Sequence, residues 1–345
     1  MSRFRLFTPD AQYADDGLIE RQTAGPDVDW EIHRAMLPRD LPTDGLAVCD
    51  AIVTWHAMPI DRAFIAMLKR CRIIVRAGVG FDHIDLEAAA EAGIPVANTP
   101  DYGTSEVADH AMALMLALRR GIVAYHQHLV ADPLAGFDFA VAPLVRRLRG
   151  RTFGVVGLGR IGTATALRAR AFGMDVIAYD PYVSRGTEIA VGVERTETLG
   201  ALLAASDVVS LHTPLTEETR GMINAATLRQ MKHDAILINT ARGAVVDVPA
   251  LIDALRDRVI AGAGLDVLPV EPPAADDAIA LAYRGRHDPL VGDRLLLTPH
   301  AAWSSPESVS DARRLAVETA MLYLREGKLR NLVNAPAKTR LRGVA

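Results

Sequence analysis

The chain has 345 residues, half of them apolar, and a formal net charge of −4. This length predicts about two domains with sizeable cores. The weak negative charge and the lack of a dense basic run give no sign of a nucleic-acid surface. The two cysteines, Cys49 and Cys71, do not have the spacing of metal ligands, so we expect no metal site.

The sequence also gives no sign of a membrane partner. No stretch of about 18 apolar residues is free of charges, so we expect no membrane span. Residues 1–7 read as a short strand and lack the apolar core of a signal peptide. We therefore expect a cytoplasmic protein.

Strands and helices alternate along the chain, which indicates parallel sheets with helices on both faces. In the first hundred residues, the predicted strands are 4–7, 50–54, 72–76 and 95–97, and the predicted helices are 60–69 and 86–92. A long apolar helix is predicted at 105–120, and its apolar side chains are expected either in the core or in a dimer interface. Residues 125–145 contain prolines and are expected to be irregular.

A second α/β unit is predicted from residue 151 onward. Its strands are expected near 152–156, 175–179, 207–211, 235–238, 261–265 and 295–297. A last helix at 306–325 is expected to return to the first unit. The sequence thus predicts two Rossmann-like or flavodoxin-like α/β domains, 1–100 plus 305–345 for substrate and 101–304 for the cofactor, with the substrate in a cleft between them.

A glycine-rich turn follows the apolar run 153–156 and opens a predicted helix. The turn is Gly157-Leu158-Gly159-Arg160-Ile161-Gly162, and Asp180 closes the next strand, 18 positions beyond Gly162. This order of strand, turn, helix, strand and acid is the context that a dinucleotide-binding fingerprint requires. Asp180 would bond the ribose hydroxyls and repel a 2′-phosphate, which predicts NAD. Arg185 lies five residues further on and could soften that preference.

Three polar residues, Arg242, Glu271 and His300, follow predicted strands of the second unit. Because ligands of an open parallel sheet lie outside the carboxyl ends of its strands, these side chains could converge beside a nicotinamide. Hydride transfer between a hydroxy acid and a keto acid needs a proton carrier that titrates near neutral pH, and His300 is suited to this role. Arg242 can hold a carboxylate and polarise a carbonyl. Glu271 can orient the imidazole and favour its protonated form.

Five motifs in this order resemble those of the D-isomer-specific 2-hydroxyacid dehydrogenase family, over roughly residues 50–334. They are the glycine-rich turn, 239–243, 264–267, Glu271-Pro272 and 298–300. Within the family the chain looks closest to the C-terminal-binding-protein branch, through 180–182 and 300–303. The resemblance implies an NAD-dependent D-2-hydroxyacid dehydrogenase, an oxidoreductase that acts on a small 2-hydroxyacid or 2-keto acid. It also favours a homodimer.

The resemblance assigns residues to each part of the site. It implies that Arg242, Glu271 and His300 are catalytic, and that Asp266 bonds the nicotinamide carboxamide. The expected cofactor-binding residues are Gly157, Leu158, Gly159, Arg160, Ile161, Gly162, Asp180, His212, Thr213, Pro214, Thr219, Thr240, Ala241, Arg242, Asp266, His300 and Ala302. The expected substrate-binding residues are Arg76, Val79, Gly80, His56 and Trp303. For Arg76, His56 and Trp303, a purely structural role is the alternative.

Two other functions stay open. The similarity to C-terminal-binding proteins, which are co-regulators, raises the alternative of an NAD(H)-sensing, co-regulator-like interaction protein. The second alternative is an NADPH-preferring glyoxylate or hydroxypyruvate reductase, against which Asp180 argues. One departure from the family pattern is the long segment 274–294 between Glu271 and His300, which could cover the active-site mouth or contact a partner subunit.

Overall fold

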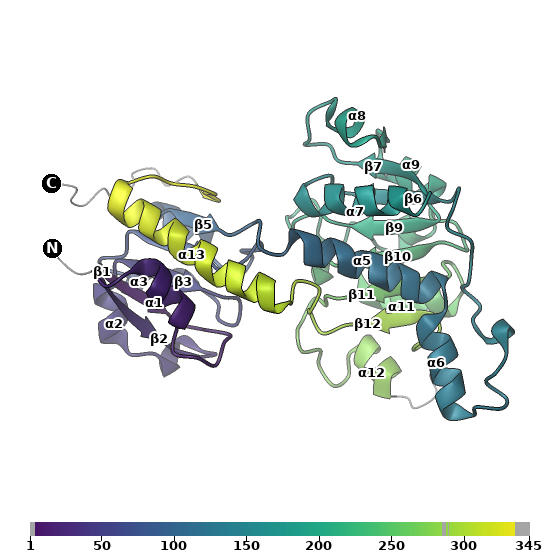
Figure 1. The fold of residues 1–345 in the computed structure, drawn as a ribbon, viewed down its shortest axis with the longest axis horizontal. Coiled ribbons are helices and arrows are strands. Elements are labelled where there is room, and N and C mark those ends of the chain that lie inside the picture. Colours follow the sequence, from purple (N-terminus) through teal and green to yellow (C-terminus); the bar gives the residue numbers. More distant parts are fainter. Residues whose placement is uncertain (1–3, 285–287, 289, 335–345) are drawn as a thin grey trace. The chain divides into compact units, whose positions relative to one another are not determined.

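The computed structural model describes residues 4–284, 288 and 290–334. The chain divides into two compact units, unit 1 formed by 1–103 with 305–345 and unit 2 formed by 104–304 (Figure 1). Each unit is built on a parallel sheet with helices packed against it, which confirms the predicted α/β fold class. Residues 1–3 of the expected first strand and 335–345 of the expected first domain lie outside the described residues.

Unit 1 contains a five-stranded parallel sheet with the order β2-β1-β3-β4-β5, the order of flavodoxin-like folds. Its strands are β1 (Phe4–Thr8), β2 (Val28–Ile32), β3 (Ala51–Thr54), β4 (Ile73–Arg76) and β5 (Val96–Asn98). Its helices are α1 (Leu18–Ala24), α2 (Thr43–Val48), α3 (Arg62–Met67), α4 (Leu86–Glu91) and α13 (Pro306–Glu326), with a 3-10 turn at Pro38–Asp40.

Side-chain caps mark the starts of α3, α4 and α13 in unit 1. Asp61 caps α3 and Asp85 caps α4, each by accepting from a backbone N–H in the first turn. Ser305 and Ser308 form a capping box at the start of α13, and Gly327 ends that helix with φ 68°. The caps on α3 and α4 also fix the ends of the loops that follow β3 and β4, which carry the predicted substrate residues.

Unit 2 contains a seven-stranded parallel sheet with the order β12-β11-β10-β9-β6-β7-β8. Its strands are β6 (Thr152–Val156), β7 (Asp175–Tyr179), β8 (Glu194–Arg195), β9 (Val208–Leu211), β10 (Ile236–Asn239), β11 (Gly262–Leu265) and β12 (Leu295–Leu297). Its helices are α5 (Thr104–Arg119), α6 (Ile122–Ala131), α7 (Arg160–Ala171), α8 (Thr187–Val191), α9 (Leu199–Ala205), α10 (Ala225–Leu228), α11 (Val248–Arg256) and α12 (Ala278–Arg284), with 3-10 turns η2 (Phe139–Val141) and η3 (Gly243–Val245). The strand order reverses between β6 and β9, as in the Rossmann fold.

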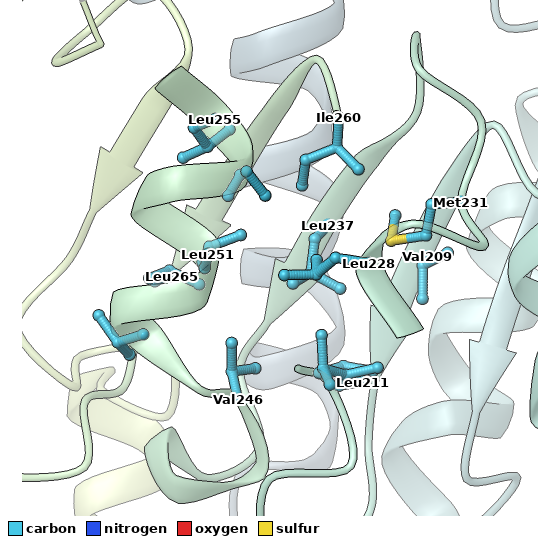
Figure 2. Close-up of a cluster of buried hydrophobic side chains, with 14 of the residues drawn as sticks. Val209, Leu211, Leu228, Met231, Leu237, Val246, Leu251, Leu255, Ile260 and Leu265 are labelled. Atoms are coloured by element: carbon cyan, nitrogen blue, oxygen red, sulfur yellow. The ribbon is translucent and has the colours of Figure 1, made fainter. Parts of the chain in front are cut away.

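Two layers of apolar side chains pack on the two faces of the unit 2 sheet. Figure 2 shows Leu237 and Leu265 of the sheet packed with Leu251 and Leu255 of α11, and all four are at most 1% exposed. Burying a leucine fully contributes roughly 1.5–3 kcal/mol. On the opposite face, α5 buries its apolar side chains against β10 and β11. The long apolar helix is therefore core of unit 2, and the ends of β10 and β11 are firmly placed.

Two stretches differ from the sequence-based expectations. Residues 125–145 are not wholly irregular, because α6 continues to Ala131 before the chain becomes loop-like. The segment 274–294 contains α12, which packs on α11 and buries Ile279 in the same core, and Leu290 of the segment is buried there too. It joins parallel strands β11 and β12, so it serves as their crossover connection. Residues 285–287 and 289 of this segment lie outside the described part.

In the described ranges, no helix is both long and apolar enough to cross a membrane. Likewise, no group of three or more His, Cys, Asp or Glu side chains among the described residues could hold a metal ion.

Candidate active site

The glycine-rich turn lies between the end of β6 and the start of α7. Gly157 has φ 94°, and a Cβ there would lie 2.8 Å from the carbonyl oxygen of His212. A Cβ on Gly162 would lie 1.9 Å from the carbonyl oxygen of Gly157, so helix and strand pack too closely for any other residue. A Cβ on Gly159 would meet nothing within 4 Å. The turn thus offers open space at the first N–H groups of α7, where a pyrophosphate can bind.

Asp180 follows β7 and faces back to this turn. Its Oδ2 accepts from the Leu158 N–H at 2.8 Å, and its Oδ1 accepts from the N–H groups of Tyr182 at 2.8 Å and Val183 at 3.2 Å. The nearby cation, Arg185, forms an exposed ion pair with Glu197 at 3.0 Å. The carboxylate of Asp180 is therefore fixed beside the glycine-rich turn, and Arg185 already forms an ion pair with Glu197.

Three side chains after β9 and β10 carry buried polar atoms that have no hydrogen-bond partner. The atoms are Nδ1 of His212, Oγ1 of Thr213 and Oγ1 of Thr240. An unsatisfied buried group costs about 1–3 kcal/mol, which a polar ligand can remove. By contrast, the Thr219 hydroxyl donates to the carbonyl of Pro214 at 2.7 Å and shapes its own loop. Together with the space over Gly159, the unsatisfied atoms fit a dinucleotide at this edge.

His212 is neutral in the folded protein. Burial of its ring lowers the pKa of His212 to about 3, although part of the residue is exposed. Its Nε2 lies 2.9 Å from the Ser210 hydroxyl, so the ring keeps one polar contact within the chain. An uncharged ring at this place adds no positive charge to the predicted cofactor site.

His300 and Glu271 form a close pair. Nδ1 of His300 lies 2.6 Å from Oε2 of Glu271, and Oε1 of Glu271 accepts from the Leu268 N–H at 2.8 Å. The two side chains are 31% and 34% exposed, so a small molecule can reach them. His300 has φ 54°, a left-handed conformation that is uncommon outside glycine. The carboxylate thus orients the imidazole in a site open to solvent.

Arg242 follows β10 in a loop that is fixed by Asn239. The side chain of Asn239 accepts from the Ala241 N–H at 3.0 Å and donates to the Arg242 carbonyl at 2.9 Å. The guanidinium donates to the Ala241 carbonyl at 2.7 Å. Since β10, β11 and β12 are neighbouring parallel strands, the structure brings Arg242, Glu271 and His300 to the same edge of the sheet.

Asp266 anchors the loop that carries His300. Its carboxylate, 1% exposed, accepts from the Thr298 hydroxyl at 2.6 Å and from the N–H groups of Ala301 and Ala302, both at 2.9 Å. Sequence reasoning assigned Asp266 only to the nicotinamide carboxamide and missed this anchoring. An ionised carboxylate has about four acceptor positions, so these three donors leave one for a ligand.

In unit 1, the loop after β4 is held from within. Arg76 is 7% exposed, and its guanidinium donates to the carbonyls of Ala77 and Gly80, the latter at 2.8 Å. Asn98 donates to the carbonyl of Val79 at 2.7 Å. The structure therefore gives Arg76 a supporting role in the loop. Asn98 was not singled out from the sequence, where it follows a short strand without a recognisable signal.

His56 lies in the loop after β3, with its Nε2 at 3.5 Å from Nε2 of Gln12. The buried carboxylate of Asp10 fixes this loop by accepting from the N–H groups of Trp55 at 2.8 Å and Ala57 at 3.1 Å. Sequence reasoning missed Asp10, whose only signal is its place shortly after a strand. Arg76, Val79, Gly80 and His56 belong to unit 1, whereas the half-buried Trp303 belongs to unit 2 with the catalytic trio.

The rest of the predicted cofactor set also lies at the carboxyl edge of the unit 2 sheet, in the segments that follow β6, β7, β9, β10, β11 and β12. A glycine fingerprint at the strand-order reversal and an oriented imidazole at the same edge define a nicotinamide-dinucleotide oxidoreductase. Residues 112–302 match the model for the NAD binding domain of D-isomer specific 2-hydroxyacid dehydrogenases. The chain belongs to the D-isomer specific 2-hydroxyacid dehydrogenase family and is an NAD-dependent enzyme, as its motifs predicted.

Similar proteins support this membership. The chain is 41% identical to the glyoxylate reductase of Korarchaeum cryptofilum over 286 residues, 83% of each chain. It is 31% identical to the D-lactate dehydrogenase of Aquifex aeolicus, solved with NAD and lactic acid, with a TM-score of 0.82 over 96% of this chain and 100% of that one. The NADPH-dependent glyoxylate/hydroxypyruvate reductase of Sinorhizobium meliloti, solved with NADP and malonate, is 30% identical, with a TM-score of 0.84 over 99% and 100%. The chain spans about half the length, 52%, of the D-3-phosphoglycerate dehydrogenase of Archaeoglobus fulgidus, to which it is 37% identical over 84% of its own length.

Proposed function

We propose that this enzyme interconverts a small 2-keto acid and its D-2-hydroxyacid, with His300 as the acid and base. The observation that supports this most is the 2.6 Å contact between His300 Nδ1 and Glu271 Oε2. Because Glu271 occupies Nδ1, proton exchange with a substrate falls to Nε2. His300 protonates the carbonyl oxygen in reduction and takes the hydroxyl proton in oxidation. The bound nicotinamide supplies or accepts the hydride.

Other residues bind and polarise the substrate. Arg242 holds the carboxylate and withdraws charge from the carbonyl oxygen, which a guanidinium does well through paired N–H donors. The N–H groups of Val79 and Gly80 bind the carboxylate. This role is supported by Arg76, because its guanidinium donates to the carbonyls of the same loop and so fixes the loop's conformation. His56 and Trp303 contact the substrate and shape the space for its side chain.

The cofactor that we propose for turnover is NADH. The fixed carboxylate of Asp180 supports this choice, because it would repel a 2′-phosphate. The ion pair between Arg185 and Glu197 supports it further, since that guanidinium already has an anionic partner. The similar reductase that uses NADPH makes a direct comparison of NADH and NADPH necessary.

The test is a panel of 2-keto acids assayed for NADH oxidation. The names of the similar proteins point to glyoxylate, hydroxypyruvate and pyruvate as first members. We expect turnover of at least one member and formation of the D-hydroxyacid. Tight NADH binding without turnover of any member would favour the NAD(H)-sensing interaction protein, an alternative that the enzyme names of the similar proteins do not support. A cytoplasmic location is also proposed, consistent with two buried free cysteines, and cell fractionation tests it.

We further propose a homodimer formed through the segment 130–139. Its apolar side chains Val130, Leu134, Phe137 and Phe139 are 71–90% exposed. Such an apolar surface on one chain typically marks a protein interface. Light scattering should give the mass of a dimer for the wild type and of a monomer for the double variant Phe137→Asp/Phe139→Asp. Ile189→Asp, at an exposed apolar position of α8, serves as the control and should remain dimeric. A monomeric wild type would overturn this assembly.

A further inference from the structure

A chain of hydrogen bonds links α5 to the loop that carries His300. Nε2 of His110 lies 2.9 Å from Oγ1 of Thr298, although the two residues are 188 positions apart. The Thr298 hydroxyl lies 2.6 Å from Oδ1 of Asp266. Asp266 in turn bonds the backbone directly after His300. His110 is therefore connected to the predicted proton carrier through two intermediate side chains.

The chemistry of the groups fixes the direction of each bond. The carboxylate of Asp266 can only accept, so the Thr298 hydroxyl must donate its proton to it. The same hydroxyl oxygen is then left to accept from His110, and Nε2 of His110 must carry a hydrogen. Successive bonds of this kind polarise and strengthen one another. The donor sequence thus runs from His110 to Thr298 to Asp266.

Asp266 holds the backbone on both sides of His300. Its carbonyl oxygen accepts from the His300 N–H at 2.8 Å, and its carboxylate accepts from the N–H groups of Ala301 and Ala302. Between these bonds His300 adopts φ 54°, a conformation that persists only when the surroundings enforce it. The Asp266 carboxylate therefore helps to fix the backbone that carries the imidazole of His300.

We propose that His110 is a positioning residue for His300, acting through Thr298 and Asp266. By donating to Thr298, it keeps the hydroxyl aimed at Asp266 and so maintains the left-handed backbone at His300. The His110 side chain is 24% exposed, and its Nε2 also lies 3.7 Å from Oδ1 of Asp266, at the end of the same chain of bonds. The inference rests on the proposed role of His300 and adds a residue of α5 that lies outside the glycine turn and the predicted catalytic trio.

The first test compares His110→Leu, which loses the donor, with His110→Gln, which can keep a donor near the position of Nε2. The readouts are kcat and KM for a keto acid, the NADH dissociation constant, and hydrogen exchange at the amides of Ala301 and Ala302. For His110→Leu we expect a fall in kcat and faster amide exchange, each about 3- to 10-fold, which is the effect of losing one hydrogen bond. NADH affinity should stay within about 2-fold. His126→Leu, at an exposed position of α6, is the control and should change neither readout.

His110→Gln should recover most of both losses, which a space-filling role would not predict. An equal loss of kcat in His110→Gln and His110→Leu would overturn the hydrogen-bonding role. Thr298→Val and Thr298→Ser test the middle of the chain, and they keep the inference testable if His110→Leu does not fold. The valine should behave as His110→Leu does and the serine as the wild type. The double variant His110→Leu/Thr298→Val should lose no more kcat than either single variant, because both substitutions interrupt the same series of hydrogen bonds.

The exchange measurement needs no turnover, so it separates this inference from the proposed function. A wild type that reduces no keto acid would contradict the proposed function, and faster exchange at Ala301 and Ala302 in His110→Leu would still support the bond chain. Unchanged exchange in both His110→Leu and Thr298→Val would overturn the inference, whatever the activity of the wild type.

Discussion

Glu271 accepts from the Leu268 N–H with one oxygen, at 2.8 Å, and contacts Nδ1 of His300 with the other, at 2.6 Å. The backbone thus fixes the carboxylate, and the carboxylate fixes the imidazole. Nε2 of the ring is thereby left to exchange a proton with the substrate.

Glu271→Gln should therefore lower the rate of reduction. The amide has one acceptor oxygen, so it cannot accept from both the Leu268 N–H and Nδ1 of His300, and the imidazole loses its fixed orientation. We expect kcat/KM to fall by roughly 10- to 100-fold. Steady-state rates with a keto acid measure this effect, and Asp276→Asn, which removes an exposed carboxylate of the same loop, should leave kcat/KM unchanged. A wild-type kcat/KM in Glu271→Gln would remove Glu271 from the mechanism.

Asp180→Asn should weaken the preference for NADH over NADPH. The amide has one acceptor oxygen, so it keeps either the bond from the Leu158 N–H or those from Tyr182 and Val183, and it has no charge to repel a 2′-phosphate. We expect the ratio of kcat/KM values for the two cofactors to shift by about 10-fold or more toward NADPH, as for the loss of a charged hydrogen bond. The matched control is Asp175→Asn, at the exposed start of the same strand. An unchanged ratio would contradict the assignment of Asp180.

Substitutions of Gly162 and Gly159 should separate an effect on stability from an effect on cofactor binding. At Gly162 an added Cβ would collide with a backbone oxygen, and overpacking of this kind costs roughly 1–3 kcal/mol or more of the free energy of unfolding. At Gly159 φ is −74° and the space is open, so Gly159→Ala should fold as the wild type does. Its Cβ would instead occupy the pyrophosphate position and weaken NADH binding by about 10-fold or more. Urea unfolding and NADH titration measure the two effects, and wild-type NADH affinity in Gly159→Ala would argue against the site.

Low pH should destabilise the protein through His212. Burial lowers the pKa of His212 from 6.5 in an exposed ring to about 3 in the folded chain. Below about pH 6.5 the unfolded chain binds a proton that the folded chain refuses, so stability is lost as the pH falls through that window. At pH 5 the loss from this residue is at most about 2 kcal/mol. His212→Asn should flatten the pH dependence of the unfolding free energy between pH 7 and pH 5, whereas the exposed-site control His126→Asn should not. Equal slopes in His212→Asn and the wild type would contradict a neutral buried ring.

Much of the fold and of the unit 2 site could be predicted from local sequence. Arg242 and His300 each lie three positions after a strand, and both strands are apolar runs that the sequence reveals directly. The glycine turn is equally local, because a tight bend and a close approach each demand glycine within one short segment. These features require no knowledge of long-range contacts.

The remaining features depend on contacts between distant residues. Strand β2 and helices α1 and α2 are short and mixed in polarity, and they were not predicted. Asp10 acts on residues 44–48 positions away, and His110 on one 188 positions away, so no spacing in the sequence reveals either role. The anchoring role of Asp266 was missed for the same reason, because its partners lie in the segment after β12.

The proposed mechanism depends most directly on His300. The decisive measurement is NADH oxidation over the panel of 2-keto acids by the wild type and by His300→Gln, with the NADH dissociation constant of each. We predict that the wild type reduces at least one keto acid, and that His300→Gln lowers kcat for it by about 100-fold or more while NADH affinity stays within about 3-fold. Turnover by His300→Gln at the wild-type rate would contradict His300 as the proton carrier.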